Sequence, residues 1–292
     1  MKILLFGASG QLGRFLQREK PRDVELLTPS RNEVNFASGN LLCDFIIKEN
    51  PDWVINAAAY TDVEKAEEER LFATDLNHGG PSCIAWACQF TGSKLLHIST
   101  DYVFDGTAIH PYEPSDPPNP INYYGYTKLR GEQAIADIMS PSSFCILRTS
   151  WLYSAFRKNF FASVFKKLLF DKDFNVVNDQ FGRPTSAICL AKVCWQIVLR
   201  GITGVHHFAE APSMSRHAFA LKIRSIAETT CVGDSLSSVL AVPSTEYKTR
   251  ALRPRYSVLA NSVSLDELGL GDNDWEKNIE TTIYDFVFQD PS

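Results

Sequence analysis

The sequence predicts an α/β fold, namely a Rossmann-type doubly wound parallel sheet with a smaller discontinuous α/β substrate domain. Three observations predict it: apolar runs alternate with helical stretches in the first half of the chain, a glycine-rich turn follows the first run, and the alternation loosens from about Trp151 onward. We therefore expect an NAD(P)-binding domain over residues 1–150, to which part of 174–202 returns, and a mainly substrate-binding domain over 151–292.

Five short apolar runs, each bounded by Gly, Pro, Asn or Asp, are typical of buried parallel strands: Lys2–Phe6, Val24–Leu27, Trp53–Ala57, Lys94–Ser99 and Ser143–Arg148. The stretches between them favour helices: Gln11–Glu19, Leu41–Glu49, Glu67–Thr91 and Thr127–Met139. The segment His110–Pro120 holds five prolines and is predicted to be a loop between a strand and a helix, where α/β folds place active-site loops.

In the second half the pattern predicts three helices, Asn159–Leu169, Ser215–Thr229 and Trp275–Phe288, and a strand over Gly204–Glu210.

The composition excludes some classes of function. The net charge of the 292 residues is −5, so the chain lacks the excess of basic residues that is typical of nucleic-acid-binding proteins. The apolar run Ile3–Phe6 is too short for a signal sequence or a membrane span. The seven cysteines form no CxxC pair, so we expect reduced thiols in a cytoplasmic protein.

The glycine-rich turn is Gly7-Ala8-Ser9-Gly10-Gln11-Leu12-Gly13. Glycines permit the tight turn and the close approach of a pyrophosphate, and the following helix N-terminus presents free N–H groups to the phosphates. The alternative is a purely structural turn, because the spacing is G-x-x-G-x-x-G and not G-x-G-x-x-G. Its place between the first strand and the first helix favours the dinucleotide site.

Cofactor choice depends on the end of the second strand, where an acid would bind the ribose 2′-hydroxyl of NAD. The chain has Leu27-Thr28-Pro29-Ser30-Arg31 there, without an acid. Arg31 is suited to a 2′-phosphate, since a guanidinium binds phosphate through two parallel hydrogen bonds. We therefore expect NADPH as cofactor and keep NADH open, as we keep open that Arg31 is a solvated loop residue.

The catalytic candidates begin with Tyr124 and Lys128, which share a helical face at i and i+4. Reducing a ketone requires a proton donor, and a fixed cation lowers the pKa of a phenol toward neutrality. Ser99 and Thr100 end a predicted strand at the ligand-binding edge of the sheet. Strand alternation lets only one of these two hydroxyls face the cleft and polarise a carbonyl.

Together with further runs, these motifs resemble the dTDP-4-dehydrorhamnose reductase family of the extended short-chain dehydrogenases, along nearly the whole chain. The runs that carry the resemblance are Gly7–Gly13, Asn56–Tyr60, Ser99–Gly106, Tyr124–Glu132, Arg148–Tyr153, Asp179–Thr185 and Arg253–Ser257. The resemblance implies NAD(P)H-dependent reduction of the C4 keto group of dTDP-4-dehydrorhamnose to dTDP-L-rhamnose, a step of deoxysugar biosynthesis.

The resemblance also implies the roles of single residues. Tyr124 would be the proton donor, Lys128 its activator and ribose ligand, and Thr100 would hydrogen-bond the keto oxygen. The cofactor would contact Gly7, Ser9, Gly10, Gln11, Leu12, Gly13, Arg31, Asn56, Ala57, Ala58, Tyr60, Tyr124 and Lys128. The sugar nucleotide would contact Tyr102, Trp151, Arg183 and Arg253. Aromatic packing remains open for Tyr102 and Trp151, and a surface salt bridge for the two arginines.

Two departures from the family limit these implications. Val34-Asn35-Phe36 replaces an acid that commonly lies near the adenine. In addition, no acids for an interfacial Mg²⁺ are identifiable, so we predict no metal and leave a homodimer open.

Two further features have structural interpretations. The acidic run Glu64–Arg70 has the spacing of a solvated helix face, and Asn77 is expected either to orient a water or to make a buried hydrogen bond.

Other functions remain open on the same fold. A related nucleotide-sugar reductase or a 4-epimerase fits these motifs, as does a non-enzymatic, cofactor-binding regulatory subunit. A 4,6-dehydratase fits less well, because Thr100-Asp101 is followed by Tyr102 and not by Glu. The intact set of Thr100, Tyr124 and Lys128 favours the reductase.

Overall fold

The computed structural model describes residues 1–30, 32–34, 39–170, 173–230, 236–271 and 274–288. Its centre is a parallel sheet of six strands in the order β10-β5-β4-β3-β1-β2. These strands are β1 Lys2–Phe6, β2 Glu25–Leu27, β3 Trp53–Asn56, β4 Lys94–Thr100, β5 Phe144–Thr149 and β10 Gly204–His207. The strand order reverses between β1 and β3, which is where such sheets open a ligand-binding crevice at their carboxyl ends. The Rossmann-type fold is thereby confirmed.

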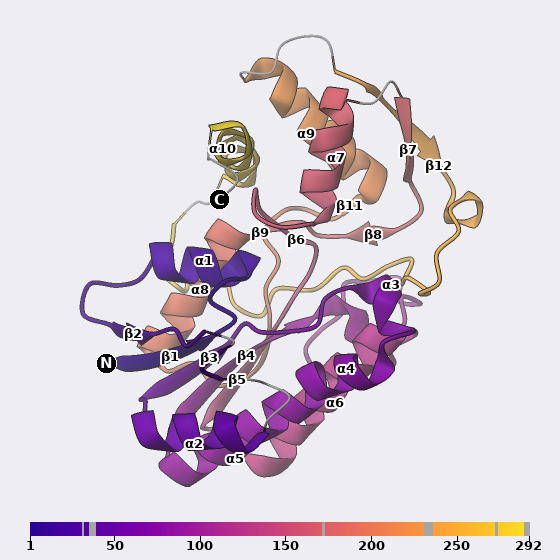
Figure 1. Ribbon diagram of the computed structural model, residues 1–292. Helices are drawn as coiled ribbons and strands as arrows, with labels where there is room; N and C mark the ends of the chain where they lie inside the picture. The colour runs from indigo at the N-terminus through magenta and orange to yellow at the C-terminus, as the bar shows by residue number, and fades with distance from the viewer. Residues whose placement is uncertain (31, 35–38, 171–172, 231–235, 272–273, 289–292) are drawn as a thin grey trace.

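Helices cover both faces of this sheet (Figure 1). On one face lie α1 Gln11–Arg18 and α8 Ala187–Arg200, and on the other lie α2 Gly39–Glu49, α5 Gly80–Thr91 and α6 Tyr123–Ile138. Alternate residues of β1 enter the two cores, Ile3 and Leu5 toward α1 and α8, Leu4 and Phe6 toward α2 and α5. This is the pattern of a strand buried on both sides.

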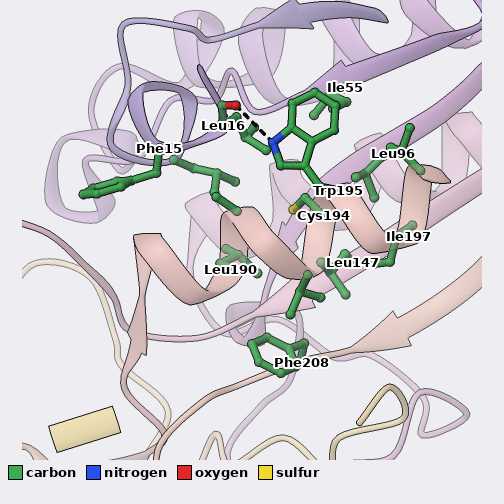
Figure 2. Close-up of a cluster of buried hydrophobic side chains, with 14 of the residues drawn as sticks. Phe15, Leu16, Ile55, Leu96, Leu147, Leu190, Cys194, Trp195, Ile197 and Phe208 are labelled. Carbon is green, nitrogen blue, oxygen red and sulfur yellow. Dashed lines mark hydrogen bonds between the residues drawn. The ribbon is translucent and has the colours of Figure 1, made fainter. Parts of the chain in front are cut away.

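Helix α8 is held to the sheet by an almost wholly apolar face (Figure 2). Trp195 is buried in that face, and its indole N–H donates to the carbonyl of Leu16 on α1 at 3.0 Å. The side chain of Ser186 caps the start of the helix by accepting from the N–H of Cys189. Each fully buried Leu or Ile contributes roughly 1.5–3 kcal/mol, so the apolar face of α8 contributes substantially to the stability of the sheet layer.

A smaller layer lies over the carboxyl ends of the strands (Figure 1). Its core joins α7, α9 and α10 around Phe161, Phe165, Phe219 and Ile283. The elements of this layer are α7 Phe160–Phe170, β7 Asp173–Val177 paired in parallel with β12 Ser238–Val242, α9 Arg216–Thr229 and α10 Trp275–Phe288. Short pairs connect it to the sheet: β6 Leu152–Tyr153 with β9 Thr185–Ser186, and β8 Phe181–Gly182 with β11 Met214–Ser215.

Helix α8 and strand β10 belong to the sheet layer although both follow residue 150 in the chain. The predicted strand from Gly204 therefore ends at His207 and pairs with β5, not with the smaller layer. The domain boundaries of the sequence analysis stay predictions. The segment His110–Pro120 is a loop, as predicted, with an isolated bridge from Tyr112 to Leu259.

Two helix predictions were wrong in their bounds. The stretch Glu67–Thr91 is not one helix but α4 Arg70–Thr74, a π-helical turn Asp75–Gly79 and α5, preceded by α3 Val63–Ala66. Helix α6 begins at Tyr123 and not at Thr127, because Asn122 caps it by accepting from the N–H of Gly125 at 2.8 Å. Short 3₁₀ turns cover Asp101–Val103 and Ser244–Glu246. Among the described residues, no helix combines the length and apolar character that crossing a membrane requires.

Candidate active site

The catalytic candidates meet where β4 ends and α6 begins. Because α6 starts at Tyr123, Tyr124 and Lys128 lie one turn apart on the same helix. Thr100 is the last residue of β4, and its hydroxyl lies near enough to the Tyr124 phenol to lower the pKa of Tyr124. The same hydroxyl donates to Asp101 Oδ1 at 3.1 Å and accepts from the N–H of Tyr102 at 3.2 Å. A phenol and a hydroxyl are thus side by side at the carboxyl edge of the sheet.

Ser99 is excluded as the second hydroxyl. It points to the opposite side of β4, where it donates to the buried carboxylate of Glu132. Glu132 in turn pairs with Arg148 of β5 at 2.7 Å, and both side chains are about 5% exposed. This buried ion pair fixes α6 against the sheet, and strand alternation leaves Thr100 as the residue that faces Tyr124.

Lys128 is fully enclosed behind the tyrosine. Its Nζ donates to the carbonyl of Ile98 at 2.7 Å and lies 3.2 Å from Nε2 of His97. Burial lowers the pKa of Lys128 to about 8, and the nearby negative charge of Glu132 opposes that shift. A lysine with this pKa exchanges its proton close to neutral pH.

The pKa of Tyr124 differs from the sequence-based expectation. Burial raises it above the ordinary value of 10, against the effect of the nearby Thr100 hydroxyl, and the charges on Asp101 and Tyr102 raise it further. The expected lowering by Lys128 does not dominate, because the Nζ hydrogen bonds are directed to Ile98 and His97. Tyr124 therefore keeps its proton at pH 7, as a donor to a developing alkoxide must.

The glycine-rich turn forms a cradle that side chains would fill. Gly7 has φ +85°, and a Cβ there would lie 2.6 Å from the main chain of Ala57. A Cβ on Gly13 would lie 2.1 Å from the carbonyl oxygen of Gly7. Gly10 precedes α1 without a side-chain cap, so the first N–H groups of the helix stay free for an anion. These features fit a dinucleotide diphosphate.

The other residues of the turn have different partners. Leu12 is buried in the core, so only its main chain can face a ligand. Gln11 accepts from Ser154 and Asn159, both at 2.9 Å, and the carbonyl of Ser9 accepts from Arg157 Nε at 3.0 Å. The turn is therefore tied to the segment that follows β6, a connection that the sequence motif does not contain.

The loop after β3 lies against this turn. The N–H of Ala57 donates to the carbonyl of Phe6, and the N–H of Ala58 donates to Asn56 Oδ1 at 3.1 Å. Tyr60 is buried, and its hydroxyl donates to Glu69 at 2.7 Å. Asn77 makes a buried hydrogen-bond clamp: it accepts from the N–H of Tyr60 and donates to the carbonyl of Tyr60 and to Thr127.

Arginine and aromatic side chains surround Tyr102, which lies next to Tyr124. The Tyr102 ring stands edge-on to Tyr124 with centroids 5.9 Å apart, and its hydroxyl accepts from Arg253 at 3.4 Å and lies near Arg216. Arg216 lies 3.6 Å above the ring of Trp151. Trp151 has φ +47°, a conformation that a bulky residue adopts at strained functional sites.

Arg216 was not a sequence-based candidate, because it stands in no motif. Burial lowers its pKa, and so does the positive charge of Arg253, whereas the negative charge of Asp101 raises it. A half-buried guanidinium beside a second one is suited to an anionic ligand. The signal that could have found it is only its position in Ser215-Arg216, at the start of a predicted helix.

Two other predicted arginines have different outcomes. Arg183 donates to the carbonyls of Ala211 at 2.7 Å and Leu259 at 3.1 Å, so its guanidinium holds two loops together and we leave it out of the site proposed below. Arg31 lies outside the described residues, as do Asn35 and Phe36. The role of Arg31 in cofactor choice stays a prediction.

The acidic run Glu64–Arg70 is not simply a solvated face. Glu64 pairs with Arg253 at 2.6 Å and accepts from the N–H of Arg250 at 2.9 Å. Glu67 accepts from the N–H of Tyr123 at 2.8 Å, at the start of α6. Of these acids only Glu64 lies in a helix, α3, whereas Glu67–Glu69 form the turn between α3 and α4, and tertiary contacts use both Glu64 and Glu67. Among the described residues no three His, Cys, Asp or Glu side chains gather as metal ligands, and the predicted absence of a metal stays a prediction.

Comparison with known proteins follows the same motifs. The family model described as RmlD substrate binding domain matches residues 1–288. The chain is 33% identical to a dTDP-4-dehydrorhamnose reductase of Burkholderia thailandensis, over 99% of this chain and 100% of the relative. It is 35% identical to the enzyme of that name from Salmonella typhimurium, over 89% of each chain. The chain belongs to the dTDP-4-dehydrorhamnose reductase family.

Solved structures of the family agree with the fold. A dTDP-4-dehydrorhamnose reductase of Clostridium acetobutylicum superposes with a TM-score of 0.89 at 33% identity, covering 97% of this chain and 98% of that one. The enzyme of the same name from Bacillus anthracis, solved with NADP, gives a TM-score of 0.89 at 31% identity, covering 97% and 99%. The predicted family and its Rossmann-type reductase fold are confirmed.

Proposed function

We propose that this chain is an NADP(H)-dependent reductase that converts the C4 keto group of a dTDP-4-keto-6-deoxy sugar to an alcohol, with dTDP-4-dehydrorhamnose as substrate and dTDP-L-rhamnose as product. The observation that carries the proposal is the meeting of Thr100, Tyr124 and Lys128 at the edge of the sheet, between the glycine cradle and a pair of arginines. Relatives named for this activity, at about a third identity over nearly the full chain, support it.

The cofactor end is formed by the main chain. The cradle of Gly7, Gly10 and Gly13 and the free N–H groups of α1 would hold the diphosphate, and Lys128 the nicotinamide ribose. When bound there, NADPH supplies the hydride for the keto carbon. The loop of Ala57 and Ala58 would border it, since a Cβ on Gly7 would clash with that loop.

The proton comes from the chain itself. Tyr124 holds its proton at neutral pH and would give it to the C4 oxygen as negative charge develops there. The ammonium of Lys128, one turn along α6, would stabilise the phenolate that remains. Thr100 would hydrogen-bond the same oxygen. Its hydroxyl now donates to Asp101, so binding requires that hydroxyl to rotate toward the substrate.

The substrate diphosphate would lie between Arg216 and Arg253. Both guanidiniums approach the Tyr102 hydroxyl, and Tyr102 in turn contacts Tyr124. This order supports a diphosphate site that is separated from the proton donor by the ring of Tyr102. Trp151, fixed by Gly182 behind it and Arg216 above it, would form the wall of the sugar site.

A second reductase activity has an observation in its favour. A dTDP-4-keto-6-deoxy-D-glucose reductase of Streptomyces niveus is 34% identical to this chain over 88% of each. The two activities differ in the sugar and share the C4 keto chemistry. The regulatory-subunit alternative is disfavoured by the proton donor and its lysine. The dehydratase alternative is also disfavoured, because the carboxylate of Asp101 is held by Ser257 at 2.5 Å behind Thr100.

The test is product analysis with purified protein. We would supply NADPH with dTDP-4-dehydrorhamnose, generated in place by a 3,5-epimerase, and in parallel with the unepimerised dTDP-4-keto-6-deoxy-D-glucose. The proposal predicts NADPH oxidation with the epimerised sugar and dTDP-L-rhamnose as product. Turnover of only the unepimerised sugar would favour the second activity. Turnover of neither, by protein that binds NADPH, would contradict both.

The wider setting is proposed from the same site. We propose a nucleotide sugar as the partner of this chain, without nucleic acid, and the cytoplasm as its location, where NADPH is regenerated. The six described cysteines, all free, support a reducing compartment. A homodimer and acceptance of NADH remain open proposals, to be tested by sedimentation and by comparing kcat/KM for the two cofactors.

A further inference from the structure

His97 lies in a buried chain of side chains between Asn56 and Lys128, and neither the proposed site nor the proposed chemistry uses His97 itself. It is the fourth residue of β4 and has no exposed surface. Its Nδ1 lies 3.1 Å from Nδ2 of Asn56 on β3, and its Nε2 lies 3.2 Å from Nζ of Lys128 on α6. The imidazole thus bridges the loop beside the cofactor cradle and the catalytic lysine.

The orientation of Asn56 determines which nitrogen of His97 carries the proton. Asn56 Oδ1 accepts from the N–H of Ala58 at 3.1 Å, so its Nδ2 is the atom that faces the imidazole. An amide NH₂ only donates, so Nδ1 of His97 must accept. Burial, and secondly the positive charge of Lys128, lower the pKa of His97 well below its ordinary value, so the ring is neutral. A neutral ring that accepts at Nδ1 carries its proton on Nε2.

That proton points at Nζ of Lys128. An N–H directed at Nζ is a good hydrogen bond when the lysine is a neutral amine, and an unmatched contact when it is an ammonium. The ammonium would have a hydrogen-bond acceptor on His97 only if the imidazole proton moved from Nε2 to Nδ1. The Asn56 amide would then have to flip so that its oxygen accepts from Nδ1, and it would lose its hydrogen bond from the N–H of Ala58. In either case, charging Lys128 breaks one contact of the chain.

The other charged groups near Lys128 do not offset this. Glu132 lies one turn further along α6, and its carboxylate is held by Arg148 of β5 and by Ser99 of β4. Tyr124 lies one turn earlier and is neutral at pH 7. The remaining hydrogen bond from Nζ goes to the carbonyl of Ile98. His97 is therefore the neighbour whose proton position depends on the charge of the lysine.

We propose that His97 is a positioning residue that couples the protonation of Lys128 to the Asn56–Ala58 loop, with its proton on Nε2 facing Nζ. The inference rests on the proposed function only in that Lys128 serves Tyr124. Reduction consumes a proton that the Tyr124–Lys128 pair supplies. Through its contact with Nζ, His97 sets the apparent pKa at which this pair loses that proton.

The first experiment needs neither substrate nor turnover. Histidine is labelled with ¹⁵N, and the imidazole nitrogens of His97 are observed by NMR in the wild-type protein at pH 9, where Lys128 is mainly a neutral amine, assigned by their loss in His97→Gln or by through-space contacts to Ile146. The expected spectrum has a protonated Nε2 and an unprotonated Nδ1. A ring protonated on Nδ1, or on both nitrogens, would overturn the proposal even if the enzyme is fully active.

The second experiment uses His97→Gln, whose amide oxygen can turn to accept from Nζ and so favour the ammonium. We expect the basic limb of the kcat/KM profile to move up by about one pH unit, a tenfold change in the acid constant. His206→Gln on β10 is the matched control and should leave the limb in place. Equal loss of kcat/KM at every pH, with the limb unmoved, is what a packing role gives and would contradict the proposal. If this variant does not fold, the wild-type spectrum decides.

Discussion

The guanidinium of Arg216 lies 3.6 Å above the ring of Trp151. This contact joins the first residue of α9 to the strained residue that follows β5 and Ser150, and it brings a cation from the smaller layer to the edge of the sheet. The same guanidinium lies near the Tyr102 hydroxyl, which accepts from Arg253. The proposed phosphate site is thus assembled from three distant parts of the chain.

Arg216→Ala should raise KM for the sugar nucleotide by about 100-fold while kcat changes little, because the guanidinium binds substrate and transition state alike. Arg216 is half-buried, and the loss of a buried charged partner costs about 2–5 kcal/mol. A 100-fold rise in KM corresponds to ~2.7 kcal/mol, near the lower end of that range. Steady-state kinetics measure it. Arg255→Ala is the control, since Arg255 is in the same loop as Arg253 but 76% exposed. Equal effects of the two variants would remove Arg216 from the site.

Thr100→Val should lower kcat by about 100-fold at nearly constant KM, as the loss of one hydrogen bond to a developing oxyanion does. Thr100→Ser keeps the hydroxyl and should keep most of the rate. Thr149→Val is a matched control, because Thr149 pairs with Thr100 across β4 and β5 and its buried hydroxyl has no hydrogen-bond partner within the described chain. A Thr100→Val variant with wild-type kcat would show that this hydroxyl does not touch the keto oxygen.

Gly13→Ala should distort the glycine-rich turn and weaken NADPH binding. The added methyl would lie 2.1 Å from the Gly7 carbonyl oxygen, so the turn must move, at a cost of about 1–3 kcal/mol in stability. We expect at least a tenfold weaker Kd for NADPH, measured by fluorescence titration, and a lower Tm. Gly79→Ala, where a Cβ meets nothing within 4 Å, should change neither. Unaltered NADPH binding in Gly13→Ala would argue that the diphosphate lies elsewhere.

Asp101 should make stability depend on pH. Burial raises the pKa of Asp101 to about 6, against the hydrogen bonds from Ser257 and Thr100 and the charge of Arg216. The folded state binds this proton more tightly than the unfolded state, so the contribution is present at low pH and is lost as pH rises through about 6. Relative to Asp101→Asn, the wild type should lose about 2 kcal/mol of unfolding free energy between pH 4.5 and 7.5. Urea titrations at both pH values measure it, and a constant difference would contradict the shift.

The sequence predicts those parts of the site whose residues are close together in the chain. The glycine turn needs seven consecutive residues, and Tyr124 and Lys128 need only helical spacing, so local pattern was sufficient for both. The choice between Ser99 and Thr100 needed the structure, because strand alternation requires one of them to face away but does not tell which. Glu132, which binds Ser99, lies 33 positions further along the chain.

The remaining parts depend on tertiary contacts. Glu64 and Arg253 are 189 positions apart, and no spacing rule joins them. Local sequence pattern also could not predict the π-helical turn around Asn77, because the amide of Asn77 hydrogen-bonds Tyr60 and Thr127 and not its own helix. The predicted start of α6 at Thr127 was four residues late, because the Asn122 side chain caps the helix by accepting from the N–H of Gly125 and so allows it to begin at Tyr123.

The central claim is that Tyr124 protonates the keto oxygen. The measurement that tests it most directly is the single-turnover rate of NADPH oxidation with dTDP-4-dehydrorhamnose, in wild type and in Tyr124→Phe, with Tyr123→Phe one residue earlier on α6 as control. We predict a fall of about 10²–10⁴-fold in Tyr124→Phe, with NADPH binding kept, and a rate close to wild type in the control. A Tyr124→Phe variant that turns over at the wild-type rate would contradict the account.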